Sequence, residues 1–391
     1  MNSGKIRLNP GEEKRLLKGE PWVYNNEVNQ LLGPIQSGEI VSVYSYEGQY
    51  IGQGFLNTKS KIFVRLLSRK EEPIDQSFFA EKLNFANRLR IEAGYEDAYR
   101  AFFAEADGIP GLIVDKYGDY LAVSFLSLGI DRLKDEIVVL LDQLFHPKGI
   151  YERSDSPIRE KEGLLQIHGL LMGTVPDWVK TREGDCQFLV DIKSGQKTGT
   201  YLDQSKNHLA IIPYCKDKRV LDCFSHAGHF AIQAKCAGAR AVTAVDISHD
   251  ACDLIRRNQQ LNNVSFPIVE ADVFDFLEAE IDKGNRVDLV ILDPPAFTKT
   301  KTKLPQAIKG YKQINRQAMR LLEDGGYLVS ASCSQHLSLN DFLDLIRDAA
   351  SDIGKQVQLV DLRIQGQDHP VLLSSETSLY LKFLILRVFP L

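Results

Sequence analysis

Four aspartates recur at the ends of apolar segments in the second half of the chain. Asp222 closes the first segment in "VLDCFSHAGHF", Asp246 and Asp272 follow the next two, and Asp293 opens "DPPAF" after the fourth. In an open parallel sheet, ligands bind beyond the carboxyl ends of the strands. Each carboxylate alone could equally cap the helix that follows it. The series of four nevertheless predicts a ligand site at one edge of a sheet.

The first turn of this series indicates what kind of ligand it serves. Gly228 is the only glycine between Asp222 and Phe230, so the G-x-G-x-x-G loop that cradles a pyrophosphate is missing. Asp246 follows Gly228 by eighteen residues, close to where a ribose-binding carboxylate stands in nucleotide folds. Carboxylates also suit the amino groups and the sulfonium of S-adenosylmethionine. We therefore predict this cofactor, with Asp272 toward its adenine.

Cys333 lies between two serines in "SASCSQH", where the strand after the Asp293 segment ends. Free cysteine is most often a small core residue, and a lone thiol leaves that alternative open. In a parallel sheet, however, Cys333 and Asp293 overhang the same crevice. A thiolate that adds to C6 of cytosine activates C5 for methylation, and an acid at the N3 and N4 edge stabilises the developing charge. This reasoning predicts Cys333 as nucleophile and Asp293 as its partner at the base.

The stretch after Asp293 combines a stiff loop with a run of positive charge. Two prolines follow the aspartate, and no acidic residue occurs from Pro294 to Leu322. Such a run is often only a solvated helix face. Beside a rigid loop it suits phosphate contacts, which makes RNA the favoured partner. The predicted RNA-binding residues are Lys299, Lys301, Lys303, Lys309, Lys312 and Arg316.

The elements that must position these residues change in type along the chain. Residues 5–68 contain short alternating segments with a hairpin signal at Glu47 and Gly48, which predicts a small β-rich domain. Residues 73–187 mix helical and strand patterns, as in an α+β domain. Beyond residue 188 strands alternate with helices, which predicts an α/β domain with a mostly parallel sheet. The predicted domains are 1–72, 73–187 and 188–391.

Composition is that of an ordinary globular protein. Of the 391 residues, 44% are hydrophobic and 25% are charged, and the net charge of −5 gives no bulk attraction to nucleic acid. No apolar run suits a membrane span or a signal peptide, so a cytoplasmic location without membrane contact is expected. Cys223, His226 and His229 follow one another at intervals of three, but no fourth ligand is evident, the spacing fits no common zinc pattern, and no metal is predicted.

The chain resembles the ribosomal large-subunit methyltransferase I family over essentially its whole length. The stretches that carry the resemblance include "KGEPWVY", "EADGIPGLIVDKYG", "VDIKSGQKTGTYLDQ", "VLDCFSHAGHF", "DPPAF", "SCS" and "DHPV". The resemblance implies an N-terminal β-barrel-like PUA domain, a central α+β domain and a C-terminal Rossmann-like class I methyltransferase domain. It also implies cytosine C5 methylation of 23S ribosomal RNA, in the large subunit or its precursor.

The resemblance assigns roles to individual positions. The implied cofactor-binding residues are Gln204, Asp222, Phe224, Ser225, Gly228, Asp246, Asp272 and Asp293. The sequence departs from the family pattern at Ser205 and His208, where arginines are usual, at His226 in place of tyrosine, and at Gln335 in place of glycine. The first two departures bear on RNA or cofactor contacts near residues 205–208.

Two other functions fit parts of the pattern. Asp-Pro-Pro-aromatic loops also grip exocyclic or ring nitrogens, so an RNA N-methyltransferase without a covalent intermediate is an alternative. Phe297 stands one position too late for that loop, and Cys333 would have no role in it. A non-catalytic RNA-binding assembly factor is a second alternative, against which the aspartate series argues. An exposed edge strand in either small domain would permit a homodimer.

Overall fold

The computed structural model describes residues 4–298, 301–375 and 378–391, and these fall into two compact units. The first unit comprises Met1–Val179, Val190–Leu202 and Gln367–Ser378. The second comprises Lys180–Leu189, Asp203–Gly366 and Leu379–Leu391. The chain therefore crosses between the units more than once, and the predicted division into three consecutive domains stays a prediction.

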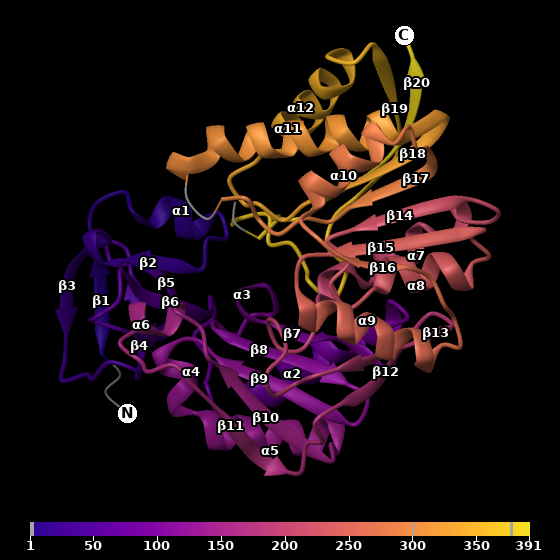
Figure 1. Cartoon of the computed structure of the whole chain (residues 1–391). Coiled ribbons are helices and arrows are strands. Elements are labelled where there is room, and N and C mark those ends of the chain that lie inside the picture. The colour runs from indigo at the N-terminus through magenta and orange to yellow at the C-terminus, as the bar shows by residue number, and fades with distance from the viewer. Residues whose placement is uncertain (1–3, 299–300, 376–377) are drawn as a thin grey trace. The chain divides into compact units, whose positions relative to one another are not determined.

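The first unit begins with a six-stranded sheet that bears out the predicted β-rich region (Figure 1). Its strands lie in the order β2-β6-β5-β4-β1-β3, and β1 pairs parallel with β4 and antiparallel with β3. Alternate side chains such as Ile6, Val43 and Val64 point into its core. The elements are β1 (Lys5–Leu8), α1 (Glu13–Leu17), β2 (Trp22–Tyr24), β3 (Val28–Leu32), β4 (Ile40–Tyr44), β5 (Tyr50–Leu56) and β6 (Ile62–Ser68).

A second, five-stranded sheet of the same unit has the order β11-β10-β9-β8-β7, with helices α2 and α5 packed on it. Asp75 caps α2 by accepting a hydrogen bond from the Phe78 amide. The strands are β7 (Ala98–Phe103), β8 (Leu112–Tyr117), β9 (Tyr120–Phe125), β10 (Gly149–Ser154) and β11 (Ile167–Gly173). The helices are α2 (Gln76–Glu92), α3 (Ala104–Asp107), α4 (Leu128–Arg132), α5 (Lys134–Phe145) and α6 (Ile158–Lys161).

The second unit is built on a seven-stranded sheet in the order β16-β15-β14-β17-β18-β20-β19. Its first five strands are parallel, whereas β20 runs antiparallel to both of its neighbours. The strands are β14 (Arg219–Cys223), β15 (Ala241–Asp246), β16 (Ile268–Glu270), β17 (Val287–Leu292), β18 (Leu322–Ser332), β19 (Lys355–Arg363) and β20 (Lys382–Pro390). All seven lie beyond residue 188, where the sequence predicts strands that alternate with helices. A two-stranded sheet, β12 (Val179–Glu183) with β13 (Cys186–Val190), lies at the boundary of the two units in the sequence.

Helices cover both faces of this sheet (Figure 1). One apolar core joins the sheet to α10, α11 and α12, and the other joins it to α8 and α9. Side-chain caps from Ser248, Asp272 and Ser338 begin α9, α10 and α12. The helices are α7 (Ser205–Ala210), α8 (His229–Cys236), α9 (His249–Leu261), α10 (Val273–Asp282), α11 (Leu304–Leu321) and α12 (Leu339–Ser351). The predicted α/β class is confirmed.

Among the described residues, no helix combines the length and the apolar character needed to cross a bilayer.

Candidate active site

The candidate site lies where the strand order of the second unit reverses. β14 stands between β15 and β17, so the crevice beyond its carboxyl end is the switch point at which ligands bind in such sheets. The parallel register pairs Cys223 with Leu292 and Leu292 with Ser330. Asp293 directly follows Leu292, and Cys333 lies three residues after Ser330. The register thus brings these two predicted residues to the same sheet edge.

The turn after β14 has an unusual backbone. Phe224, His226 and Gly228 all have positive φ, at 61°, 49° and 78°. A non-glycine residue in this region costs of the order of 1 kcal/mol or more, and such strain tends to gather at ligand sites. The Ser225 hydroxyl donates to the carbonyl of Asp222 at 2.8 Å, which closes the turn. The backbone is thereby folded tightly in front of the N-terminus of α8.

Asp222 is fully buried at the end of β14. Its Oδ2 accepts a hydrogen bond from the Ala231 amide at 3.2 Å, while Oδ1 has no partner among the described residues. Burial raises the pKa of Asp222 to about 7, the charge of Asp293 adds to this shift, and the nearby Ser225 hydroxyl and the Ala231 amide oppose it. A buried oxygen without a donor is costly unless a ligand satisfies it. This carboxylate is therefore suited to a cationic or N–H group that arrives from outside.

The next two aspartates hold backbone amides. Asp246 accepts from the amide of His226 at 2.9 Å through Oδ2 and from Ser248 at 2.9 Å through Oδ1. Asp246 thus ties the strained turn to the end of β15. Asp272 is the N-cap of α10 and accepts from the Phe274 amide at 2.8 Å, so the capping alternative holds for this residue. Its proposed contact with adenine has to coexist with that cap.

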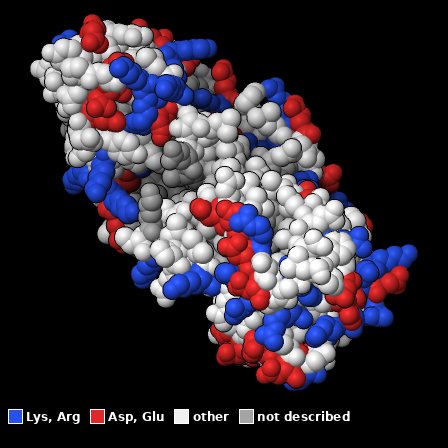
Figure 2. Space-filling view, turned by 90° about the horizontal axis from the view of Figure 1, so that it is seen from above, with Lys and Arg blue, Asp and Glu red and all other residues white. Residues whose placement is uncertain are grey.

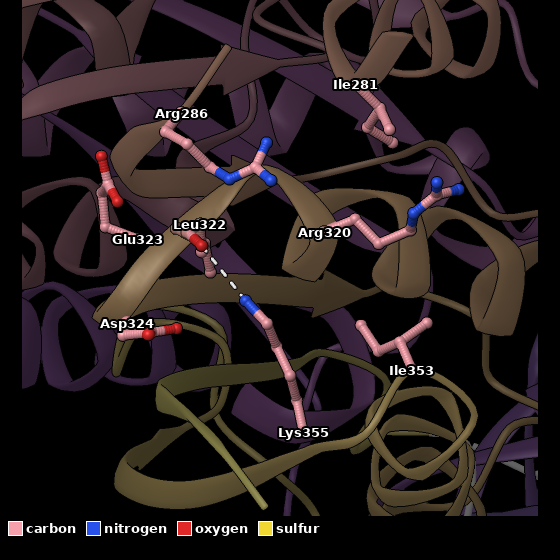
Figure 3. Close-up of a pocket in the computed structure, with 8 residues that line it drawn as sticks. All are labelled: Ile281, Arg286, Arg320, Leu322, Glu323, Asp324, Ile353 and Lys355. Carbon is pink, nitrogen blue, oxygen red and sulfur yellow. Dashed lines mark hydrogen bonds between the residues drawn. The ribbon is translucent and has the colours of Figure 1, made fainter. Parts of the chain in front are cut away.

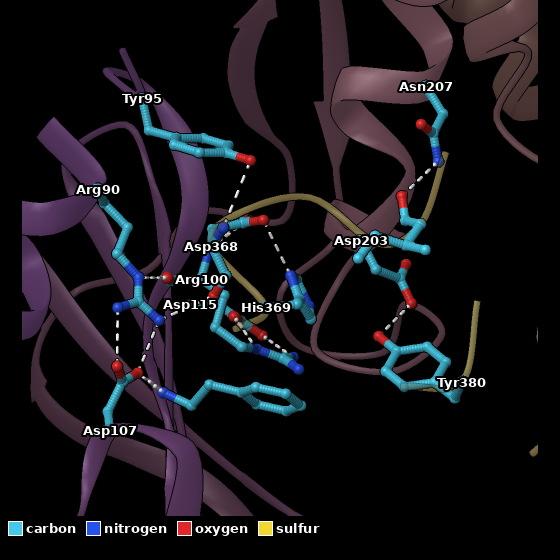
Figure 4. A network of polar contacts seen from close by, with 12 residues as sticks. Arg90, Tyr95, Arg100, Asp107, Asp115, Asp203, Asn207, Asp368, His369 and Tyr380 are labelled. Atoms are coloured by element: carbon cyan, nitrogen blue, oxygen red, sulfur yellow. Dashed lines mark hydrogen bonds and ion pairs between the residues drawn. The ribbon is translucent and has the colours of Figure 1, made fainter. Parts of the chain in front are cut away.

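Asp293 is oriented by a chain of amides. The Nε2 group of Gln204 donates to Asp293 Oδ1 at 2.9 Å, and its Oε1 accepts from Asn207 at 2.8 Å. Gln204 is buried, so its orientation is fixed by these two contacts. The neighbouring Asp203 accepts from the Tyr380 hydroxyl at 2.8 Å, which anchors the same segment (Figure 4). Gln204, predicted to bind the cofactor, therefore positions Asp293 in this structure.

Cys333 is half-buried just past the end of β18. The Ser334 side chain beside it lies 3.1 Å from the Tyr311 hydroxyl, and the Ser334 carbonyl accepts from Lys382 Nζ at 2.7 Å. Gln335, which replaces the usual glycine, is exposed. The thiol is thus neither a core residue nor a freely exposed one, which fits the predicted nucleophile.

Three of the six predicted RNA-binding residues, Lys309, Lys312 and Arg316, lie on α11, and Lys303 directly precedes this helix. Lys303, Lys309 and Arg316 are exposed, whereas Lys312 is half-buried and forms an ion pair with Asp352 at 2.9 Å. Lys299 lies outside the described residues, as does the side chain of Lys301. The face shown in Figure 2 carries both signs of charge in small groups. The exposed part of the predicted RNA-binding set is therefore a local patch of positive charge at Lys303, Lys309 and Arg316.

A cluster of ionisable side chains lies elsewhere in the second unit. His208 Nδ1 is 3.0 Å from Glu183, and the His229 ring stacks on His208 with centroids 4.7 Å apart. These three residues also group ligand-type atoms within 4.8 Å of one another. The look-alike spacing predicted from the sequence shares only His229 with this cluster. Its Cys223 is instead part of the apolar core under the sheet.

The Glu183–His208 pair ties stability to pH. Burial favours the neutral carboxyl, but the two histidines outweigh it and hold the pKa of Glu183 down, at about 2. This contribution is present above the unfolded pKa of about 4.3 and is lost as the pH falls toward 2. Burial opposes the charge of His208, yet Glu183 raises its pKa. That contribution is full below about pH 6.5 and is lost as the pH rises through the folded value.

The surface pocket of about 540 Å³ shown in Figure 3 lies away from these residues. Arg286 directly precedes β17, Leu322 begins β18 and Lys355 begins β19. The pocket is therefore at the amino ends of β17 and β18, opposite the aspartate series. Lys355 Nζ donates to the carbonyls of Met319 and Leu322 at 2.9 and 3.1 Å and so caps α11.

The "DHPV" stretch has a structural role in the first unit (Figure 4). Asp368 Oδ2 accepts from the Arg100 amide at 3.0 Å, and the carbonyl of Asp368 accepts from Arg90 at 2.9 Å. His369 is buried and pairs with Asp368 at 3.0 Å. Arg90 also forms a two-point pair with Asp107. These contacts fix Asp368 and His369 against β7 and α2 of the first unit.

Comparison with known proteins decides the family. Residues 6–69 match the model of a PUA-like domain, and residues 203–336 match the model described as conserved hypothetical protein 95. Proteins named ribosomal RNA large subunit methyltransferase I from Klebsiella pneumoniae strain 342 and from Aeromonas hydrophila are each 38% identical to this chain. The alignments cover 98% of this chain and 98% and 99% of those proteins. The chain belongs to the ribosomal RNA large subunit methyltransferase I family. This confirms the predicted family and its PUA domain.

Solved structures share the fold of the family over the whole chain. A candidate SAM-dependent methyltransferase from Streptococcus mutans has a TM-score of 0.82 at 23% identity, with 98% of this chain and 99% of that chain covered. SMU.776, described as a methyltransferase complexed with SAH, has a TM-score of 0.83 at 22% identity and the same coverage. The Rossmann-like fold predicted for the last domain is confirmed.

Three residues of the site were not found from the sequence. Asn207 orients Gln204, Lys382 contacts the loop of Cys333, and Ile247 is 66% exposed directly after Asp246. Only Ile247 had a readable signal, because an apolar residue that follows a ribose-type carboxylate offers a surface for a base. The other two depend on contacts between segments distant in sequence.

Proposed function

We propose that the protein methylates C5 of a cytosine in 23S ribosomal RNA and forms a covalent adduct through Cys333. Family membership carries the coarser description, a methyltransferase that uses S-adenosylmethionine and acts on ribosomal RNA of the large subunit. The atom that is modified and the covalent step are inferences from the site. The observation that carries them is the shared sheet edge of Asp293 and Cys333, set by the register of β17 and β18.

The aspartate series fits the cofactor. Asp222 presents a buried oxygen without a described donor, which suits the ammonium of the methionine part. Asp246 and the exposed Ile247 beside it suit the ribose and the adenine face. Gly228 lets the turn pack closely on α9, because a Cβ there would lie 3.1 Å from the Ile255 side chain. When bound, S-adenosylmethionine supplies an electrophilic methyl group and no acid, base or nucleophile.

The chain's own residues must therefore activate the base. The Cys333 sulfur forms a bond to C6 of cytosine, and the C5–C6 π electrons become available for a new bond at C5. We assign Asp293 the N3 and N4 edge, where its protonated form donates its proton toward N3 as negative charge develops on the ring during this addition. After C5 is methylated, its proton leaves to a base, the sulfur–C6 bond breaks and Cys333 is restored.

Gln204 supports the role of Asp293. Its amide donates to only one carboxylate oxygen, Oδ1, through a fixed chain that includes Asn207. A carboxylate held by a buried amide keeps one orientation toward the base, which is the condition for efficient stabilisation of developing charge.

The N-methyltransferase alternative is disfavoured by Phe297. The aromatic residue of such a loop has to stack on the target base. Here the Phe297 ring packs on Tyr311 with centroids 4.5 Å apart and lies close to Gly310, where a Cβ would approach it to 3.2 Å. Phe297 therefore belongs to the contact between the loop and α11. Exposed Lys303, Lys309 and Arg316 remain as proposed phosphate contacts.

Mass spectrometry of the modified RNA tests this function. Precursor ribosomal RNA from a strain that lacks the gene is incubated with protein and cofactor, digested and analysed for the methylated atom. We expect 5-methylcytosine with wild-type protein and none with Cys333→Ala. An oligonucleotide with 5-fluorocytosine at the target should trap a complex that survives denaturing gels, because the fluorine cannot leave as a proton does. Methylation at a nitrogen, or near wild-type activity of Cys333→Ala, would refute the proposal.

A further inference from the structure

Lys382 is the first residue of β20, and the antiparallel register places it opposite Ser332 at the end of β18. Its side chain points inward, because the residue is only 5% exposed. The Nζ group donates to the carbonyl of Ser334 at 2.7 Å and to the carbonyl of Tyr380 at 3.0 Å. The ammonium is therefore held against the "SCS" loop, one residue away from Cys333 in the sequence.

The charge of this lysine is unusual. Among the described residues no carboxylate forms an ion pair with Lys382, although buried lysines are normally paired. Burial lowers the pKa of Lys382 to about 8, and the nearby Cys333 opposes this shift. The group still carries a proton at neutral pH. An unbalanced buried cation is a cost for the fold, which a negative charge formed beside it would relieve.

Cys333 influences the pKa values of Tyr311 and Lys382, and Asp293 follows β17 at the same sheet edge. Tyr311, from α11, is buried, its pKa is raised chiefly by burial, and its hydroxyl contacts Ser334 at 3.1 Å. It is neutral at physiological pH. Cys333 is electrostatically coupled to both Tyr311 and Lys382. The positive charge of Lys382 on β20 therefore acts on the ionisation of the Cys333 thiol.

We propose that Lys382 is the positioning residue that favours the thiolate form of Cys333 and holds the "SCS" loop in place. The inference rests on the proposed function of Cys333 as nucleophile. A free thiol with a pKa of about 8.5 is only a few per cent ionised at neutral pH, so such a residue needs a nearby positive charge. Lys382 supplies it without a protein counterion to neutralise it.

The test is the pH dependence of Cys333 alkylation by iodoacetamide, measured without RNA. The Cys333 peptide is quantified by mass spectrometry in a Cys236→Ser background, because Cys236 is exposed and its pKa is lowered to about 7 by a hydrogen bond with Cys186. Lys382→Gln keeps a donor for the carbonyls but removes the charge. We expect its alkylation midpoint to rise by about one pH unit, which gives roughly tenfold slower reaction at pH 7.

Two controls separate charge from structure. Lys382→Arg keeps the charge and should react within about threefold of wild type, since an ordinary nearby cation is retained. Lys355→Gln removes another lysine that donates to two carbonyls, at the opposite sheet edge (Figure 3), and should leave Cys333 unchanged. If Lys382→Gln does not fold, as judged by its thermal transition, Lys382→Met takes its place with the same expectation.

The possible results each decide the matter. If the alkylation midpoint of Lys382→Gln equals that of wild type, the proposal is overturned. It is also overturned if Lys382→Arg shifts the midpoint as much as Lys382→Gln does, because the shift would then come from altered packing and not from the lost charge. Methylation assays are run in parallel. Full activity of Cys333→Ala would refute the proposed function even if the thiol titrates as expected, so the two failures are distinguishable.

Discussion

Binding of S-adenosylmethionine is expected to weaken about tenfold when the pH falls from 8 to 6, since Asp222 has to lose a proton to receive the cofactor's ammonium. In the free protein burial is the main reason that the pKa of Asp222 stands at about 7, and the charge of Asp293 adds to it. The ammonium of the ligand would favour the carboxylate and lower that pKa in the complex. Binding therefore releases a proton wherever the free protein holds one.

The magnitude follows from the pKa of about 7. If only the ionised Asp222 binds, the apparent Kd is multiplied by about 11 at pH 6 and by about 1.1 at pH 8, a difference of roughly 1.4 kcal/mol. At pH 6 binding should release about 0.9 proton per cofactor. Calorimetry in two buffers with different ionisation enthalpies measures both the affinity and this proton.

Asp222→Asn is the control, because it keeps the shape of the side chain and cannot ionise. Its affinity should be lower at pH 8 and nearly independent of pH between 6 and 8. Any ionisation of His208, which is present in both proteins, would act on wild type and variant alike. A wild-type affinity that does not change between pH 6 and 8, or an equal slope in Asp222→Asn, would refute the role assigned to this carboxylate.

Three further predictions concern the surroundings of the site. His208→Gln should lower stability by about 2–4 kcal/mol at pH 6 and by clearly less at pH 9, because wild type loses the buried pair with Glu183 as the pH rises; denaturant unfolding at both pH values measures this. Gln204→Leu should slow methylation by roughly 10- to 100-fold through the loss of a hydrogen bond to Asp293, with little change in cofactor affinity by calorimetry. Lys309→Gln should lower RNA affinity and reduce its salt slope by about 0.7–0.9 in a binding titration.

Each of these has an outcome that would contradict it. A stability loss in the His208 variant that is equal at pH 6 and 9 would mean that packing, not charge, dominates the cluster. A Gln204 variant that loses cofactor binding together with activity would make the residue a cofactor ligand, as the family resemblance implies. An unchanged salt slope in the Lys309 variant would mean that the exposed face of α11 is only a solvated surface. Lys312→Gln is the matched control, because Lys312 is already paired with Asp352.

The sheet edge was predictable because its residues are local to the strands that carry them. β17 is an apolar run that ends at Leu292, so the position of Asp293 follows from the periodicity alone. The same reasoning places Asp222 and Asp246 at strand ends. Asp272 shows the limit of this reasoning. A carboxylate between a strand and a helix is also a typical N-cap, and Asp272 is the N-cap of α10.

The contacts that orient the site could not be predicted from sequence in the same way. Lys382 begins an apolar strand and reads as an exposed end residue, but pairing with β18 buries it beside a loop that is some fifty residues earlier in the chain. The amide chain from Asn207 through Gln204 to Asp293 likewise joins an N-terminal helix of the unit to the end of β17. Such pairings depend on strand order and register, which no single segment specifies.

Asp222 and Lys382 illustrate why the site is costly for the free protein. Because the folded pKa of Asp222 lies above its unfolded value, folding is favoured less as the pH rises from about 4 through about 7, where the carboxyl must ionise in a buried place. Lys382 is the reverse case: its pKa is lowered by burial to about 8, so its charge opposes folding below that pH. A core selected for stability would pair these groups or replace them. Both lie at the carboxyl edge of one sheet, where a cationic cofactor and a thiolate would each supply the missing charge.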